Sequence, residues 1–171
     1  KWLFLITDET NDLAVTSDFG RSRLFWNNQD GTFTDGTLAA AVGGDENGMG
    51  TTIGDANGDG LLDWFITAIS GGQRINHTGN RLYVNNGDRT FRDTTDDAGV
   101  REGYWGWAAS FLDYDNDTDL DLVMANGVLF PDNTDGVGFE DDISRFWQND
   151  GFGHFTEMSQ EVGITDERSG K

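Results

Sequence analysis

The sequence predicts an all-β protein built from four-stranded antiparallel repeats. Three observations lead to this prediction: a recurring segment, short aromatic-rich apolar runs, and many glycines between those runs. The chain has 171 residues, of which 24 are glycine, 12 are phenylalanine and six are tryptophan. Aromatic residues favour strands and glycine favours tight turns. The composition is therefore typical of short strands joined by turns.

The recurring segment has a constant spacing over much of the chain. Arg23–Phe33 aligns with Arg81–Phe91, 58 positions later, and the same spacing relates two aspartate-rich loops. A third copy begins at Arg145. Such agreement over two separate motifs indicates duplication. Four short strands in a unit of about sixty residues are the pattern of a β-propeller blade.

We therefore expect one repeat region over residues 1–171. Its expected parts are a blade remnant at 1–20, repeats at 21–78 and 79–142, and a partial repeat at 143–171. The strand signals add up to about eleven, which predicts about two to three blades, incomplete at both ends. Because open blades expose pairing edges, either a longer protein or neighbouring chains are expected to complete the sheets.

The two aspartate-rich loops predict metal sites. Each is nine residues long and has oxygen-bearing side chains at positions 1, 3, 5 and 9. Calcium takes ~6–8 oxygen ligands, and alternate positions of a curled loop can supply them together with the carbonyl of position 7. We predict two Ca²⁺ sites and no other cofactor. The predicted ligands are Asp55, Asn57, Asp59, Leu61 and Asp63 in the first loop, and Asp113, Asp115, Asp117, Asp119 and Asp121 in the second.

Two other interpretations of these loops compete with metal binding. An EF-hand needs glutamate at position 12, where this chain has Ile66 and Met124. Solvated acidic turns would explain one such loop, but two loops at the same place in a repeat favour metal binding. Thr118 occupies position 6 of the second loop, where glycine would ease the turn. The remnant of the pattern at Asp8 and Asp12 is expected to bind no metal.

Charge and composition exclude several classes of partner. The formal net charge is −20, which repels nucleic acid backbones and anionic lipids. Cysteine is absent, so disulfides and thiolate sites are excluded. No apolar run reaches the roughly 18 residues that a membrane-spanning helix needs. We expect neither nucleic acid binding nor membrane insertion.

Other candidate sites have weaker support. His77 and His154 occupy different repeat positions and are expected to be surface residues, so no catalytic residue and no enzyme activity are predicted. Asn76 begins a glycosylation sequon, Asn-His-Thr. Trp105 and Trp107 are expected to pack in the core or between blades, with a sugar platform as the alternative.

The longest insertion runs over residues 126–142 and contains the only proline. Long loops between rigid strands often carry recognition, which makes Phe130 and Phe139 candidate contact residues. A plain connection between two repeats is the alternative interpretation.

These features resemble the FG-GAP/VCBS repeat family, which includes the integrin α-subunit propeller. Asp55–Asp63 matches its signature, Asp-x-Asp/Asn-x-Asp-Gly-x-x-Asp. Leu82–Phe91, Ala125–Gly127 and Phe130–Pro131 are also similar to the cartilage-acidic-protein and ASPIC/UnbV-associated group. The resemblance implies a propeller, typically seven-bladed, that is extracellular or periplasmic, with structural calcium and with ligand contacts made by loops on a propeller face.

The function expected from these observations is a calcium-binding β-propeller module for adhesion, assembly or ligand display. It would act outside the cell, on its surface or in the periplasm, and would bind a protein or glycan ligand that the residues do not identify. Two alternatives stay open: an accessory propeller of a larger secreted enzyme, and a homopolymeric filament subunit that associates through incomplete blades.

Overall fold

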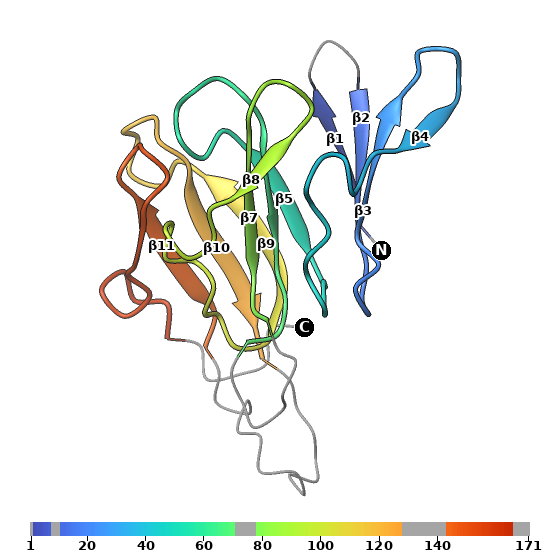
Figure 1. Ribbon diagram of the computed structural model, residues 1–171. Coiled ribbons are helices and arrows are strands. Elements are labelled where there is room, and N and C mark those ends of the chain that lie inside the picture. Colours follow the sequence, from blue (N-terminus) through green and yellow to red (C-terminus); the bar gives the residue numbers. More distant parts are fainter. Residues whose placement is uncertain (1, 8–10, 71–77, 128–142, 166–171) are drawn as a thin grey trace, which may run out of the picture.

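The computed structural model describes residues 2–7, 11–70, 78–127 and 143–165, which form twelve strands and no helix (Figure 1). The strands of the first sheet are β1 (Trp2–Thr7), β2 (Asn11–Thr16), β3 (Arg23–Asn27) and β4 (Phe33–Asp35). Those of the second sheet are β5 (Thr51–Gly54), β6 (Asp63–Ile66), β7 (Arg81–Asn85) and β8 (Phe91–Asp93). Those of the third sheet are β9 (Gly106–Leu112), β10 (Asp121–Asn126), β11 (Arg145–Asn149) and β12 (Phe155–Glu157). No membrane-spanning helix is found in the described part of the chain.

Each sheet is an antiparallel meander in which consecutive strands are neighbours. Figure 1 shows the three sheets side by side, from the blue first sheet to the orange and red third sheet. The prediction of four-stranded antiparallel blades is confirmed. The described residues contain twelve strands where about eleven were expected. Because a closed propeller needs at least about four blades, three sheets form only part of a ring.

The sheets divide the chain at different points from the sequence repeats. The expected repeat at 21–78 contains the last two strands of the first sheet and the first two strands of the second. Likewise, 79–142 spans β7 to β10. Both divisions have the same period but differ in phase, because a repeat in sequence carries no mark of which strand begins a sheet.

Apolar side chains fill the two spaces between neighbouring sheets. Between the first and second sheets, Trp64 and Tyr83 are buried with ring centroids 5.9 Å apart, and they pack near Leu24. Between the second and third sheets, Phe65 and Trp147 are buried in another cluster. Burying one such side chain contributes about 1.5–3 kcal/mol, so contacts between sheets are the main source of stability.

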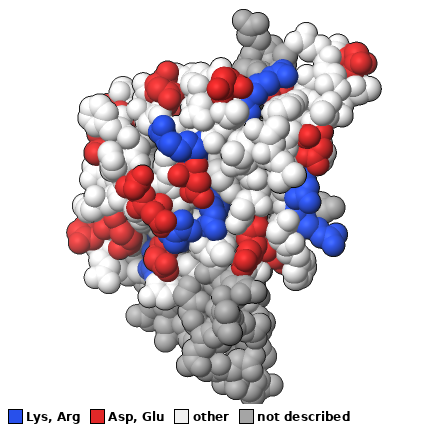
Figure 2. All heavy atoms as spheres, viewed as in Figure 1, with Lys and Arg blue, Asp and Glu red and all other residues white. Residues whose placement is uncertain are grey.

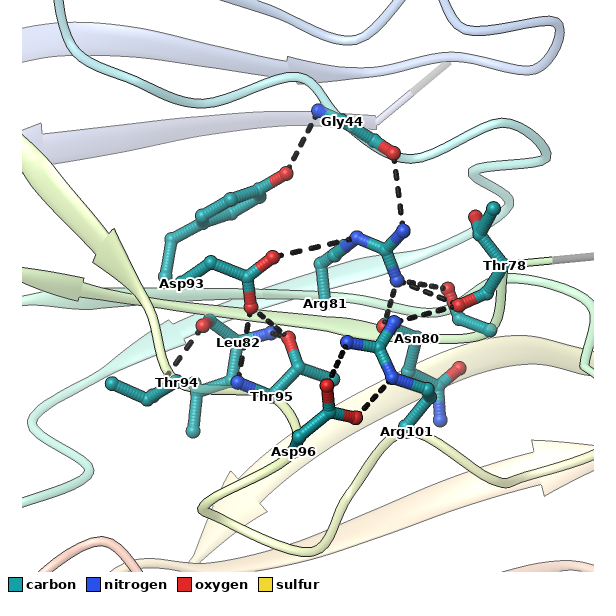
Figure 3. Close-up of polar contacts among 12 residues, drawn as sticks. Gly44, Thr78, Asn80, Arg81, Leu82, Asp93, Thr94, Thr95, Asp96 and Arg101 are labelled. Atoms are coloured by element: carbon teal, nitrogen blue, oxygen red, sulfur yellow. Dashed lines mark hydrogen bonds and ion pairs between the residues drawn. The ribbon is translucent and has the colours of Figure 1, made fainter.

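A buried arginine ties the first sheet to the second (Figure 3). Arg81 donates from Nη2 to the Gly44 carbonyl, 3.2 Å away in the connection between β4 and β5, and from Nη1 to the Thr78 carbonyl at 2.7 Å. Its Nε lies 3.6 Å from Asp93 Oδ2. The Tyr83 hydroxyl accepts a 2.8 Å hydrogen bond from the Gly44 N–H. These partners compensate the buried charge within the protein.

Trp105 directly precedes β9 and Trp107 is its second residue. Their rings stack with centroids 6.3 Å apart at 20°. Both are partly buried and pack against a small cluster around Ile69, which includes Met49. The Trp107 indole N–H donates to the Gly127 carbonyl at 2.7 Å. Both tryptophans thus pack where the second and third sheets approach each other.

Candidate metal centre

The first aspartate loop connects β5 to β6. The Asp55 carboxylate accepts hydrogen bonds from two later backbone N–H groups, Asp59 at 3.1 Å and Gly60 at 2.8 Å. Asn57 Oδ1 also accepts from the Asp59 N–H at 3.1 Å. The Asp59 carboxylate in turn accepts from the Leu61 N–H at 2.9 Å. These bonds curl the loop so that the side chains of positions 1, 3 and 5 lie on its inner side.

The second aspartate loop connects β9 to β10 and repeats this arrangement. Asp113 accepts from the N–H groups of Asp117 at 3.1 Å and Thr118 at 3.2 Å, and Asp117 accepts from the Asp119 N–H at 3.0 Å. Carboxylate oxygens of Asp113, Asp115 and Asp117 all lie within 4.8 Å of one another. This group could hold a metal ion.

The two loops share a backbone conformation at positions 4 and 6. Gly58 and Gly60 have φ of 73° and 84° in the first loop, and Asn116 and Thr118 have φ of 62° and 82° in the second. Asparagine tolerates this left-handed region, but a β-branched residue does so only under strain. Thr118 therefore adopts the same left-handed conformation as Gly60, at an energetic cost.

The aspartate at position 9 of each loop is buried and bonded to a neighbouring strand. Asp63 Oδ1 accepts from the Asn85 N–H at 2.9 Å in β7, and its Oδ2 accepts from the Ala56 N–H at 2.9 Å. Asp121 makes the equivalent bonds, to the N–H groups of Asn149 at 2.9 Å and Tyr114 at 3.1 Å. A predicted metal ligand thus also fastens its loop to the sheet. A carboxylate oxygen can serve both purposes because it carries two lone pairs.

The same bond occurs in the first sheet, where no aspartate loop is described. Asp12 is buried, and its Oδ1 accepts from the Asn27 N–H at 2.8 Å. The Asn27 side chain donates to the Asn11 carbonyl at 3.2 Å. Asp8 lies outside the described residues. This aspartate–asparagine pair is therefore a feature of the blade, whether or not a loop precedes it.

Electrostatics within the first loop favour a cation. The pKa of Asp63 is raised to about 6, and burial is the largest cause. Hydrogen bonds from the Asn85 and Ala56 N–H groups lower it, whereas the carboxylates of Asp59 and Asp55 raise it. A cation among these oxygens would lower the pKa of Asp63, because it stabilises the ionised carboxylate.

The second loop carries more negative charge. Desolvation is the first cause that raises the pKa of Asp119, and the neighbouring loop carboxylates add to it. The donors of both loops are oxygens only, the set that hard cations such as calcium prefer. Figure 2 shows further Asp and Glu side chains over the rest of the visible face. The converging carboxylates of Asp113, Asp115 and Asp117 fit a hard cation, and the position 7 carbonyls of Leu61 and Asp119 would be further donors.

The two loops lie on opposite sides of a cleft of about 220 Å³. Its lining residues are Asp55, Gly58, Thr118, Asp119, Leu120, Asn149 and Gly151. Asn149 Nδ2 donates to the carbonyls of Ala56 at 2.8 Å and Leu120 at 3.0 Å, one in each loop. A side chain on Gly151 would overlap the Asp119 carboxylate.

Sequence reasoning missed the part played by Asn149. The available signal was the recurrence of asparagine at the same place in all three repeats, Asn27, Asn85 and Asn149. These asparagines are typical of a hairpin turn, and each accepts the N–H of the residue two positions later. Their amide groups also hold the carbonyl that precedes the position 9 aspartate, which spacing alone does not reveal.

Other predicted positions are distributed as follows. His154 is exposed and pairs with Asp150, with Nδ1 3.2 Å from Oδ2. His77, Asn76, Phe130 and Phe139 lie outside the described residues, so their predictions stay untested.

Comparison with known families supports the repeat interpretation. A model of the FG-GAP-like repeat matches residues 7–66 and again residues 68–124. Each matched segment ends in the strand that follows an aspartate loop, β6 in the first and β10 in the second. A search of curated proteins finds no match. The chain belongs to the FG-GAP-like repeat family.

Proposed function

We propose that this chain is a calcium-binding β-propeller module that acts outside the cell in adhesion, assembly or ligand display. The calcium would be structural, with one ion in each aspartate loop. In the first loop, Asp55, Asn57, Asp59, Leu61 and Asp63 would hold it. In the second, Asp113, Asp115, Asp117, Asp119 and Asp121 would do so.

The observation that carries the proposal is the set of backbone hydrogen bonds that two loops of different sequence share. Both direct two backbone N–H groups at the first aspartate and bring position 5 close to it. In the second loop this leaves three exposed carboxylates whose oxygens converge within 4.8 Å. Such a cluster repels itself unless a cation is present.

Each site is placed to rigidify a blade. A bound ion would join the strand before the loop to the strand after it, and the buried position 9 aspartate would pass that constraint to a third strand. For the second loop these are β9, β10 and β11. Binding energy of this kind adds to folding energy, because the unfolded chain has no assembled site.

The proposed location rests on the family, whose propellers are mostly extracellular or periplasmic. The proposed ligand is a protein or a glycan, and the family does not identify it. Phe152, at the tip of the β11–β12 hairpin, is 77% exposed and directly follows Gly151, which lines the cleft between the loops. An exposed aromatic ring beside rigid loops is a common contact residue.

Thermal unfolding in calcium and in chelator tests the proposal. A site occupied at a calcium concentration 100 times its Kd stabilises the fold by about 2.7 kcal/mol, which raises Tm by about 5–10 °C in a domain of this size. Asp59→Ala and Asp117→Ala should each remove part of this shift. Asp97→Ala, an exposed acid outside both loops, is the control. The same Tm in calcium and in chelator would refute the proposal.

A further inference from the structure

The β11–β12 hairpin contacts both aspartate loops. At the end of β11, the Asn149 Nδ2 group carries two hydrogens and donates to two carbonyls. One carbonyl belongs to Ala56, 2.8 Å away, and the other to Leu120, 3.0 Å away. Ala56 is position 2 of the first loop, in the second sheet, and Leu120 is position 8 of the second loop, in the third sheet. One buried side chain therefore joins the two loops across the junction between two sheets.

The turn of this hairpin makes a further close contact with each loop. A Cβ added to Gly151 would lie 2.4 Å from Asp119 Oδ2, at position 7 of the second loop. A Cβ added to Gly153 would lie 3.3 Å from Asn57 Cβ, at position 3 of the first loop. Asn149 Oδ1 accepts from the N–H groups of Gly151 and Gly153, each at 3.2 Å. The same amide therefore reaches both loops and fixes the turn that packs against them.

The equivalent asparagines of the other two sheets provide a natural comparison. Asn85 Nδ2 donates to the Leu62 carbonyl at 3.2 Å, which is position 8 of the first loop. Asn27 Nδ2 donates to the Asn11 carbonyl at 3.2 Å, in a sheet where no aspartate loop is described. In the part of the chain that the structure describes, Asn149 is the one asparagine of the three that bonds to both loops.

We propose that the β11–β12 hairpin couples the two metal sites, so that calcium bound in one loop raises the calcium affinity of the other. The coupling rests on the proposed function, because it needs calcium in both loops. An ion holds its loop in the curled form, which fixes the carbonyl that Asn149 bonds. The hairpin is then held where it also supports the other loop, so the second ion orders a loop that has less freedom to lose. Asn149 is thus a positioning residue for two sites, although it ligates neither ion.

Repulsion between the two ions opposes this coupling. Asp55 of the first loop and Asp119 of the second line the same cleft, so the charges of the two loops act on each other. Salt screens this repulsion, since the Debye length is about 8 Å at physiological ionic strength and about 3 Å at 1 M. The hydrogen bonds of Asn149 are direct contacts and do not depend on that range. Coupling should therefore be positive at physiological salt and become stronger as NaCl is added.

Calcium titration of single-site variants measures the coupling. Asp59→Ala leaves the second site and Asp117→Ala leaves the first. The product of the two association constants of the wild type should exceed the product of the two single-site constants by a factor of about 5 or more. Linkage requires this coupling factor to be the same in both directions. Independent sites would give a factor of one.

The same three chains with Asn149→Ala show whether the hairpin carries the coupling. Their factor should fall to about one or below, and any effect of removing a loop charge is common to both sets and cancels. Asn149→Ser, a milder change, should lower the factor as well. Asn85→Ala should weaken the first site and keep the factor, and Asn27→Ala should alter neither site. Retained near-ultraviolet circular dichroism from the six tryptophans shows that a variant is folded.

Hydrogen exchange in chelator tests the same contacts without a metal. Asn149→Ala should speed exchange of the loop N–H groups that bond to Asp55 and to Asp113. Asn85→Ala should do so for the Asp55 partners alone, and Asn27→Ala for neither. Faster exchange in only one loop of Asn149→Ala, or a coupling factor that Asn149→Ala leaves unchanged, would overturn the proposal. A wild type that binds two ions independently would overturn the coupling alone, whereas one that binds none would overturn the proposed function as well.

Discussion

The two aspartate loops share the backbone hydrogen bonds to their first, fifth and ninth residues but have different surroundings. In Asp55–Asp63, Ala56 is buried in the core between the second and third sheets, and its carbonyl is held by Asn149. In Asp113–Asp121, the corresponding Tyr114 is 46% exposed. The first loop is thus supported by a neighbouring sheet, whereas the second is supported by β11 of its own sheet, through Gln148 Nε2 to Asp115 Oδ2 at 2.9 Å and the Asn149 N–H to Asp121 Oδ1 at 2.9 Å.

This difference indicates which loop would depend more on a bound calcium ion. The second loop has five aspartates and two non-glycine residues at positive φ, so charge repulsion and backbone strain both oppose its curled form. The first has three aspartates, an asparagine and two glycines. We infer that packing preforms the first loop and that calcium would contribute more to forming the second.

The largest expected effect comes from removing the position 9 aspartates. Asp63→Ala leaves the buried N–H groups of Asn85 and Ala56 without partners, which should lower the free energy of unfolding by about 3–5 kcal/mol. Asp121→Ala should cost less, about 2–3 kcal/mol, because the freed Tyr114 N–H can bind water. Urea unfolding in chelator measures both. A cost for Asp121→Ala equal to or above that for Asp63→Ala would contradict the comparison.

The next effect is a pH dependence specific to the first loop. The pKa of Asp63 is about 6 in the folded state, above its usual value of 3.8. Between these values the folded state binds the Asp63 proton more tightly than the unfolded state does. The contribution of Asp63 to the free energy of unfolding is therefore largest below about pH 4 and is lost as the pH rises to about 6. Its full size should be about 2–3 kcal/mol.

The non-titrating Asp63→Asn variant provides the reference for this measurement. In chelator, the wild type should lose stability relative to Asp63→Asn as pH rises from about 4 to 6. In saturating calcium, the relative trend should reverse, because protons compete with the ion. Parallel curves for the two proteins in chelator would show that the Asp63 pKa is not raised.

The smallest effect concerns the turn at position 6. Thr118 has a φ of 82°, and replacing it by glycine should relieve strain and stabilise the chain by about 1 kcal/mol. The reciprocal Gly60→Thr should destabilise the first loop by a similar amount. Urea unfolding of both variants checks this, and a destabilising Thr118→Gly would show that the threonine side chain contributes contacts outweighing its strain.

Much of the fold could be predicted from the sequence because its local signals repeat. Apolar runs bounded by glycine and asparagine marked the strands, and the recurrence of Asp55–Asp63 at Asp113–Asp121 marked the loops. Which strand begins each sheet could not be predicted, since a repeat in the sequence does not mark where a sheet begins. Spacing also suggested metal ligation at Asp63 but not its bond to Asn85, which lies 22 residues away and meets it only when β6 pairs with β7.

Contacts between sheets show the same limit. Phe33 and Phe91 are equivalent in sequence, and only the assembled sheets reveal that one is buried and the other exposed. Likewise Asn149 resembles any hairpin asparagine until the third sheet brings it against both loops. Local patterns predicted which elements form, whereas contacts between blades decided what each residue does.

Calcium titration by calorimetry measures how many ions the chain binds. We predict two ions bound by the wild type, one by Asp59→Ala and one by Asp117→Ala, with the Asp97→Ala control unchanged. We also predict that adding magnesium in place of calcium gives much weaker binding, since magnesium demands a stricter geometry. A wild type that binds no calcium, or variants that both retain its full stoichiometry, would contradict the proposal of two calcium sites.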